Sequence, residues 1–418
     1  MACAGTWNVR LRILGMPGNS KLQLRIYRTL DELQEIRPQW EDLLSSYPLS
    51  TTFSTWEWLS AWWRAFGGNQ ELLVIGAFNF ESRLIGLLPL SINRVRVGGF
   101  LPLKLLRLMS DGSQDSDNLD LPIRPGLEEE VTSCFMKYLK ENKPLWDICQ
   151  LNTMPSSSPM GATLTRQLTN EGWALETHRR ISCAIPLPAT FAEYVQQLSS
   201  EDQKNIGRYT RRLEKRYATR IYRCSQKHEV LRALDAMFEL HQARWQAVGE
   251  KGSFGSAQRR KFYHELSELL LERGWLELWA LELDSVIAAV QYAFRYGTTV
   301  FQLQEGFDSS RSSDRVGFVL RGKVLEQLIT DGVQKYDFLA GPPGYKARWS
   351  AQPGCYHDLH FAPPFSLGAS YLKFVNDAAR SKEWLRAHLP KSAWRALHWV
   401  NPSARRQSPK KRDLAGEG

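Results

Sequence analysis

The chain has 418 residues, with 54 Lys and Arg against 44 Asp and Glu, which gives a formal net charge of +10 at neutral pH. This length predicts about two or three domains, each long enough to bury its own core. Hydrophobic residues make up 43% and charged residues 23%, values that exclude a disordered, collagen-like or wholly coiled-coil chain. Aromatic residues reach 11%, so we expect a large core, an aromatic groove, or both.

The six cysteines are scattered, with no CxxC pair, and neither they nor the histidines show zinc-ligand spacing. This pattern favours a reducing compartment and predicts no metal site. No segment approaches the roughly 18 uninterrupted apolar residues of a membrane span, and the start of the chain lacks the pattern of a signal peptide. We therefore expect a soluble, cytoplasmic protein.

The first half alternates helices and strands. We expect a strand at 22–27, a helix within 31–48 with Asp31 as its N-cap, and a tryptophan-rich helix at 55–66. Two strands joined by a turn at Glu81 and Ser82 form a predicted hairpin. The remaining predictions are a Pro-, Gly- and Asp-rich loop at 97–125, a helix at 126–141, a strand at 145–151 and a loop at 155–159.

The second half repeats this order. Three strands are expected at 275–283, 286–294 and 299–307, followed by a polar loop, a helix at 313–330 and a strand at 335–341. Nearly the same distance separates Gly126 from Asp147 as Gly317 from Asp337, and an aromatic residue precedes each aspartate. These parallels predict a tandem duplication of one α/β (α+β) unit, each with a mixed central sheet flanked by helices.

The predicted boundaries follow from this repeat. They are a disordered leader at 1–21, an N-terminal unit at 22–183, a C-terminal unit at 184–365, helices at 366–400 and a basic, disordered tail at 401–418.

Two loops carry candidate chemistry. The first leads into the helix near Ser313, where Gly317 in the opening turn and the nearby Arg315 favour an anion site that fits a pyrophosphate. An ordinary serine-capped helix is the alternative. The second is the Gly-Pro-Pro-Gly turn at 341–344, which presents Tyr345, Lys346, Arg348 and Trp349 to a substrate; alternatively, the aromatics cap the core and the cations face solvent.

Two helices carry further candidates. Lys204, Arg208, Arg211 and Lys215 fall on one stripe at helical period, which forms a cradle for phosphates or an acidic polymer, or simply a solvated face. His241 and Trp245 share another helical face, where His241 is either a base or an edge-of-core residue. The chain has no GxSxG, no GxxxxGK[ST] and no GxGxxG after a strand, so hydrolase, P-loop and dinucleotide-binding functions lose their usual support.

The run from His241-x-x-x-Trp245 through GWLELWALELDSVIAAVQYAF and DRVGFVL to KYDFLAGPPGYKARW resembles the GNAT-superfamily acyltransferases of the FemAB/CelD-like branch. That branch is described as BioF-associated or cellulose-biosynthesis acetyltransferases. The resemblance covers about residues 191–350. The first half, with its TFSTWEWLSAWW segment, resembles the degenerate N-terminal copy of these proteins.

The resemblance implies a pair of GNAT folds and an acyl-thioester donor, acetyl-CoA or another acyl-CoA, bound in the second copy. The chain departs from the Q/R-x-x-G-x-G/A pattern of typical GNAT enzymes, because only Arg315 and Gly317 have counterparts. The expected donor-binding residues are Gln304, Arg315, Val316, Gly317 and Phe318.

The chemistry implied is attack of an amine on the thioester, which needs a base, an acid and stabilisation of the oxyanion. Glu305 is the first candidate base and His241 the second, Tyr345 the candidate acid, and Lys346 the charge stabiliser. The candidate substrate contacts are Trp245, Asp337, Trp349, Arg208 and Arg211.

These assignments predict an N-acyltransferase acting on an amino group of a sugar, lipid-linked saccharide or amino-acid-like acceptor, in cellulose, exopolysaccharide or envelope biosynthesis. One alternative is a Fem-like aminoacyl transferase, in which the 204–215 stripe contacts tRNA. Another is a non-catalytic protein of GNAT origin that binds an anionic saccharide or a synthase subunit.

Overall fold

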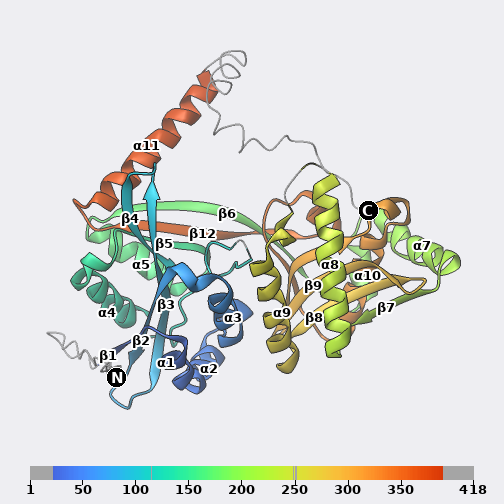
Figure 1. The fold of residues 1–418 in the computed structure, drawn as a ribbon, viewed down its shortest axis with the longest axis horizontal. Coiled ribbons are helices and arrows are strands. Elements are labelled where there is room, and N and C mark those ends of the chain that lie inside the picture. The colour runs from blue at the N-terminus through green and yellow to red at the C-terminus, as the bar shows by residue number, and fades with distance from the viewer. Residues whose placement is uncertain (1–21, 114, 248, 250–251, 389–418) are drawn as a thin grey trace, which may run out of the picture.

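The computed structural model describes residues 22–113, 115–247, 249 and 252–388. Within them, one mixed sheet of 12 strands runs through the molecule in the order β1-β2-β3-β4-β5-β12-β6-β11-β10-β9-β8-β7. Figure 1 shows two helix-covered halves side by side, with the long strands β6 and β12 running between them. The predicted leader at 1–21 and tail at 401–418 lie outside the described residues.

The N-terminal half runs from β1 to β6. Its elements are β1 (Gln23–Tyr27), α1 (Leu30–Glu35), α2 (Arg37–Ser46), η1 (Thr52–Ser54), α3 (Trp56–Phe66), η2 (Gly67–Asn69), β2 (Gln70–Phe78), β3 (Leu84–Val97), β4 (Leu101–Leu108), α4 (Glu128–Glu141), η3 (Lys143–Leu145), β5 (Ile148–Pro155), α5 (Pro159–Asn170) and β6 (Ala174–Pro186).

The C-terminal half runs from α6 to β12 and is followed by one long helix. Its elements are α6 (Phe191–Gln196), α7 (Ser200–Arg216), β7 (Thr219–Arg223), α8 (Lys227–Ala247), η4 (Ser253–Gly255), α9 (Ala257–Glu272), β8 (Leu276–Leu283), β9 (Val286–Tyr296), β10 (Thr299–Phe307), η5 (Ser309–Asp314), α10 (Val316–Thr330), β11 (Lys335–Ala340), η6 (Gly344–Trp349), β12 (Gln352–Ala362) and α11 (Leu367–His388).

The two halves repeat one unit, as the sequence predicts. In the first, β2, β3 and β4 pair antiparallel, α4 follows, and β5 pairs parallel with β4. In the second, β8, β9 and β10 pair antiparallel, α10 follows, and β11 pairs parallel with β10. The predicted fold class, two tandem units with mixed sheets flanked by helices, is confirmed.

Three local predictions are wrong. The helix expected within 31–48 is two helices, because Pro38 favours a helix start and interrupts the preceding turn. The first of them is capped by Thr29, in a capping box with Glu32, rather than by Asp31. The loop expected at 97–125 contains the strand β4, which pairs with β3 over its whole length.

The halves exchange their last strands. β6, which follows α5 in the N-terminal half, pairs antiparallel with β11 of the C-terminal half. β12, which follows β11, pairs antiparallel with β5 of the N-terminal half. The two exchanged strands also pair with each other from Gln352 to Ala362. Each half of the sheet is therefore completed by backbone from the other half.

Much of the aromatic content lies in the core where the halves meet. Phe53 of η1 contacts Phe294 of β9 and Phe301 of β10, with ring centroids 5.4 and 5.8 Å apart. Trp58 of α3 packs on Phe262 of α9 at 5.5 Å. These rings pack the N-terminal helices against the C-terminal half of the sheet and its helix α9. Among the described residues, no helix is long and apolar enough to cross a membrane.

Candidate functional site

The parallel strands β10 and β11 separate after a short contact. They pair only over Thr299–Phe301 and Lys335–Asp337. Beyond that point a bulge at Leu303 disturbs the pairing of β10 with β9. The pairing of β11 with β6 shifts between Asp337 and Ala340, where Leu339 has a φ of +61°. The two irregularities turn the strands apart, and we call the space between them the β10–β11 gap.

Lys346 holds the end of β11 in this shape. Its Nζ atom is buried and donates to the carbonyl oxygens of Phe338 at 3.2 Å and Ala340 at 3.0 Å. Burial lowers the pKa of Lys346, and the nearby carboxylates of Asp117 and Asp337 oppose that shift. Within the described residues the ammonium therefore stabilises the strained turn after β11, and its predicted role in the chemistry stays a prediction.

A partly buried ion pair bridges the β10–β11 gap. Arg321 of α10 is paired with Glu305 of β10, the candidate base. The same guanidinium lies 5.5 Å from the ring of Phe338 on β11 and 5.2 Å from the ring of Tyr345, the candidate acid. Glu305 and Tyr345 thus lie on the two sides of the gap, with Arg321 between them. The sequence analysis did not single out Arg321, because it lies in the middle of a helix.

Four of the five candidate donor-binding residues, Arg315 to Phe318, lie at the start of α10. Arg315, at the N-cap, has a left-handed backbone (φ +57°) and makes no side-chain capping hydrogen bond to the helix. The first backbone N–H groups of α10 therefore receive no cap from the side chain of residue 315. Beside it, the buried carboxylate of Asp314 is paired with Arg216 and accepts a hydrogen bond from Tyr217 at 3.0 Å.

The other predicted donor-binding residues lie in different environments. Val316 and Gly317 follow Arg315 in the first turn of α10, and Gln304 lies on β10 directly after the bulge. Phe318 is buried, with its ring 4.8 Å from that of Trp349. Trp349, a predicted substrate contact, is buried against the same ring. In this structure it is part of the core cluster under α10.

His241 and Trp245 lie on α8, as predicted from their spacing. Trp245 Nε1 donates to His241 Nε2 at 3.0 Å, and His241 is buried against the ring of Phe254. Burial, with a smaller contribution from Arg244 and Arg259, lowers the pKa of His241 to about 4. At neutral pH the imidazole is therefore uncharged, and its Nε2 lone pair is occupied. These facts make His241 a weak base in this structure.

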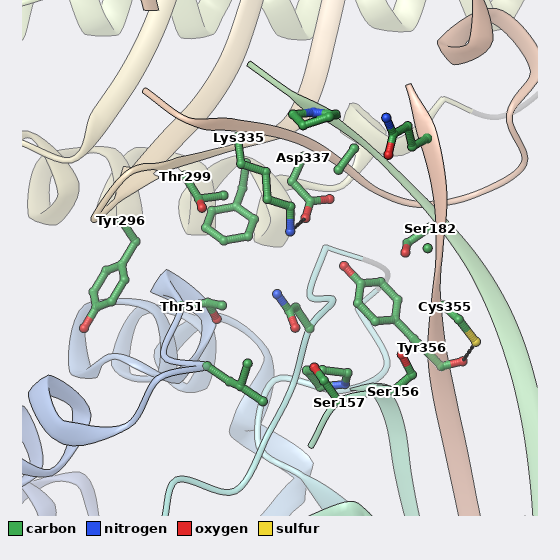
Figure 2. A pocket seen from close by; sticks show the side chains of 18 of the residues that line it. Thr51, Ser156, Ser157, Ser182, Tyr296, Thr299, Lys335, Asp337, Cys355 and Tyr356 are labelled. Atoms are coloured by element: carbon green, nitrogen blue, oxygen red, sulfur yellow. Dashed lines mark hydrogen bonds and ion pairs between the residues drawn. The ribbon is translucent and has the colours of Figure 1, made fainter. Parts of the chain in front are cut away.

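A cavity of about 700 Å³ opens where both halves meet at the base of the β10–β11 gap (Figure 2). Asp337 lines it and is paired with Lys335 at 2.8 Å. Because side chains alternate along β11, Tyr336 and Phe338 point to the other face, into the cluster with α10. Nine of its lining residues carry hydroxyl groups: Ser50, Thr51, Ser156, Ser157, Ser182, Tyr296, Thr298, Thr299 and Tyr356.

Two groups near the cavity were missed by sequence reasoning. Tyr356 on β12 lines the cavity, and its Oη atom has no hydrogen-bond partner among the described residues. Asp117, from the loop after β4, accepts the Ala340 backbone N–H at 3.0 Å, and burial raises its pKa. Neither has a local sequence signal, because Tyr356 reaches this region through the strand exchange and Asp117 through a loop of the other half.

The predicted basic stripe lies elsewhere. Lys204, Arg208, Arg211 and Lys215 are all exposed on α7. Arg211 also lines a smaller groove of about 310 Å³ between α7 and α10, opposite Phe318 and Lys323. Arg208 and Arg211 are therefore placed near the outer side of α10 rather than in the cavity beside Asp337.

Part of the chain matches a known protein family. Residues 200–347 match the family described as "Acetyltransferase (GNAT) domain". No curated protein matches the chain. The crystal structure of FemX aligns with a TM-score of 0.58 and 10% identity over 84% of this chain and 98% of that one.

Two further solved structures are similar at lower scores. The C-terminal domain of a putative lysylphosphatidylglycerol synthetase from Agrobacterium fabrum has a TM-score of 0.49 and 9% identity, over 83% of this chain and 96% of that one. A tandem GNAT protein from the clavulanic acid biosynthesis pathway has a TM-score of 0.40 and 13% identity, over 81% and 98%. Residues 200–347 thus match a GNAT-type acetyltransferase domain, and the chain as a whole has a fold similar to that of FemX.

Proposed function

We propose that the protein is an N-acyltransferase that takes an acyl group from an acyl-CoA, with acetyl-CoA the first candidate. The observation that carries the proposal is the β10–β11 gap, which has the open start of α10 on one face of the sheet and the hydroxyl-lined cavity on the other. A donor and an acceptor can therefore approach one point from opposite faces.

The donor side rests on the start of α10. Backbone N–H groups of its first turn and the side chain of Arg315 are suited to a pyrophosphate. In the reaction, the amine nitrogen attacks the thioester carbonyl, a C–N bond forms, the C–S bond breaks, and the thiolate leaves with a proton. In this proposal Glu305 receives the proton from the amine and Tyr345 supplies one to the sulfur, and the guanidinium of Arg321 contacts both residues.

The acceptor side rests on the cavity. Its hydroxyl groups can bind a sugar or an amino-acid-like backbone, and the carboxylate of Asp337 can bind an ammonium group before its deprotonation. The proposed acceptor is the amino group of a sugar, lipid-linked saccharide or amino-acid-like compound. Cellulose, exopolysaccharide or envelope biosynthesis is the proposed context, and it rests only on the resemblance of the sequence.

The donor can be tested by calorimetric titration of the full chain with acetyl-CoA. We expect saturable binding, weakened roughly tenfold in Arg315→Gly, because the variant loses a charge that faces the anion. Glycine adopts the left-handed backbone without strain, so this variant should keep the wild-type stability. Absence of binding at millimolar acetyl-CoA would refute the CoA-dependent function.

The base can be tested by Glu305→Gln, which removes the carboxylate but keeps the side-chain shape. We expect kcat to fall roughly a hundredfold with intact folding, as for loss of a general base. Glu326→Gln, an exposed residue of α10 paired with Lys323, is the matched control and should retain activity. A Glu305→Gln enzyme with unchanged kcat would remove Glu305 from the mechanism.

A second candidate function is a Fem-like aminoacyl transfer from tRNA. The observation that favours it is the exposed stripe on α7, whose four cations make no ion pair among the described residues. Binding of tRNA that weakens steeply with salt and is reduced in Lys204→Glu/Arg208→Glu would support it. If neither donor yields turnover but a saccharide still binds, the non-catalytic alternative is the better description.

A further inference from the structure

The cavity beside Asp337 is large, with a volume of about 700 Å³. The N-terminal half contributes Ser156 to its lining, the C-terminal half contributes Thr299, and the exchanged strands contribute Ser182 and Tyr356. Cavities of roughly 300–1,000 Å³ hold ligands of drug size. A single sugar ring or a single amino acid is smaller than such ligands, so this cavity has room for a saccharide of more than one ring.

Tyr356 places an unsatisfied hydroxyl group in the cavity. The residue is 5% exposed, and its Oη atom has no hydrogen-bond partner among the described residues. Figure 2 shows its ring reaching into the cavity toward Lys335 and Asp337. Burial, assisted by the carboxylates of Asp337 and Asp117, raises the pKa of Tyr356, so the phenol stays protonated at neutral pH. A buried hydroxyl group without a partner is costly, and a ligand hydroxyl group would satisfy it.

Small residues beside Tyr356 keep this wall of the cavity low. Gly354 lies two residues before Tyr356 on β12, on the same face of the sheet, and is paired with Ser182 of β6. A Cβ atom on Gly354 would lie 2.8 Å from Ser182 Oγ. A glycine within a strand often marks a place where a ligand approaches the backbone closely. A sugar ring can therefore lie against the two strands, next to the Tyr356 hydroxyl group.

The lining matches a ligand that carries little charge. Among the described residues that line the cavity, Lys335 and Asp337 are charged, and they are paired with each other at 2.8 Å. The pair has no net charge, so the lining has no excess of cations for a phosphate. Its hydroxyl groups and its amides, such as Asn118 and Gln352, can both donate and accept hydrogen bonds. The hydroxyl groups of a saccharide do the same, so the two surfaces are complementary.

We propose that the cavity binds a saccharide of more than one ring, that the amino group to be acylated lies toward Asp337, and that the Tyr356 hydroxyl group binds a sugar hydroxyl group and determines specificity. A free amino acid would fill only part of the cavity, and any phosphate of a lipid-linked saccharide would lie outside it. The proposal rests on the proposed acyltransferase function and narrows its acceptor to a saccharide.

Calorimetric titration of the full chain, with and without coenzyme A, tests the proposal. The first probe is a β-linked disaccharide of glucosamine and N-acetylglucosamine, which has one free amine. We expect it to bind saturably, more tightly than cellobiose, which has no amine, and more tightly than L-lysine. Asp337→Asn should remove the preference for the amine, because the carboxylate that binds it is lost.

Tyr356→Phe separates a role in binding from a role in folding. The variant keeps the ring and loses a hydroxyl group that makes no hydrogen bond to the described protein. We therefore expect disaccharide affinity to fall roughly tenfold while the midpoint of urea unfolding does not decrease. Tyr371→Phe is the matched control and should bind like the wild type, since Tyr371 packs in the cluster under α11 and is not among the described residues that line the cavity.

Four results would overturn the proposal. They are absence of disaccharide binding at millimolar concentration in both titrations, tighter binding of L-lysine than of the disaccharide, wild-type disaccharide affinity in Tyr356→Phe, and an unchanged amine preference in Asp337→Asn. Binding is measured without acyl transfer, so the proposed function fails separately. Disaccharide binding with the expected effects of both substitutions, but without transfer from acetyl-CoA, would refute the acyltransferase function and still support a saccharide as the ligand of the cavity.

Discussion

Lys346 has a predicted role in the chemistry and an observed role in the structure. Its position after a rigid Gly-Pro-Pro-Gly turn predicts a charge stabiliser, and its contacts show an ammonium that binds the last carbonyls of β11. These contacts lie directly beside the β10–β11 gap. The structural role alone makes Lys346 necessary for the shape of the site.

Lys346→Met should therefore reduce both stability and activity. The variant leaves two buried carbonyl oxygens without their donor, and we expect the free energy of unfolding to fall by about 1–3 kcal/mol in urea denaturation. Lys143→Met, at an exposed position, is the control and should leave it unchanged. A Lys346→Met protein as stable as the wild type but inactive would instead assign Lys346 to the chemistry alone.

His241 should make the protein sensitive to mild acid. Its pKa is about 4 in the folded protein against 6.5 in the unfolded chain, so between these values the unfolded chain binds more protons. The free energy of unfolding should thus decrease as the pH falls from about 6.5 to about 4, by up to about 3 kcal/mol from this residue. Protonation would also place a hydrogen on Nε2, against the Trp245 N–H.

Denaturation of His241→Gln at about pH 7 and about pH 4 measures this contribution. The variant should lose less stability than the wild type over this range, whereas His228→Gln, an exposed histidine, should behave like the wild type. Equal acid sensitivity in His241→Gln and the wild type would contradict the assignment.

Some site residues were predictable because their signal is local. The spacing of His241 and Trp245 places them on one face of α8. The Gly-Pro-Pro-Gly sequence predicts a tight turn that exposes the next residue, Tyr345. Arg321 was not predictable, because its partner Glu305 lies in a different element. Tyr356 and Asp117 reach β11 only through the strand exchange and a loop of the other half.

At the scale of elements, hydrophobic runs predicted most strands of both repeats, whereas the predicted N-cap Asp31 was wrong. β4 was missed because LPLKLLRL follows two glycines and includes Pro102. β6 and β12 were not anticipated. The sequence ETHRR keeps half of β6 exposed, and β12 begins Gln-Pro-Gly, which is typical of a turn. No local sequence pattern predicts that β6 pairs with β11.

The contact of α8 with β10 depends on Gly306. A Cβ atom there would lie 2.9 Å from the Met237 carbonyl oxygen, so Gly306→Ala must push α8 away from the strand that carries Glu305. We expect a loss of about 1–3 kcal/mol in thermal or urea unfolding and a raised KM. Gly68→Ala, where a Cβ atom meets no neighbour within 4 Å, is the control. Wild-type stability in Gly306→Ala would show that α8 can move away from β10 at little cost in free energy.

At the scale of the whole molecule, the exchanged strands should join the halves into one cooperative unit. A half that unfolds alone would withdraw a strand from the centre of the other half's sheet. Calorimetry of the full chain should therefore give a single transition. Two well-separated transitions would contradict this expectation.

The strand exchange also bears on how such a duplicated chain can change over time. A gene fusion or deletion with its breakpoint between the repeats would deprive β11 of β6, its hydrogen-bonded neighbour, and would break up the wall of the cavity that Ser182 and Tyr356 share. The second repeat is thus not expected to fold as a separate domain in another protein. A first repeat that retains no chemistry of its own would still be inherited with it, as the necessary half of one sheet.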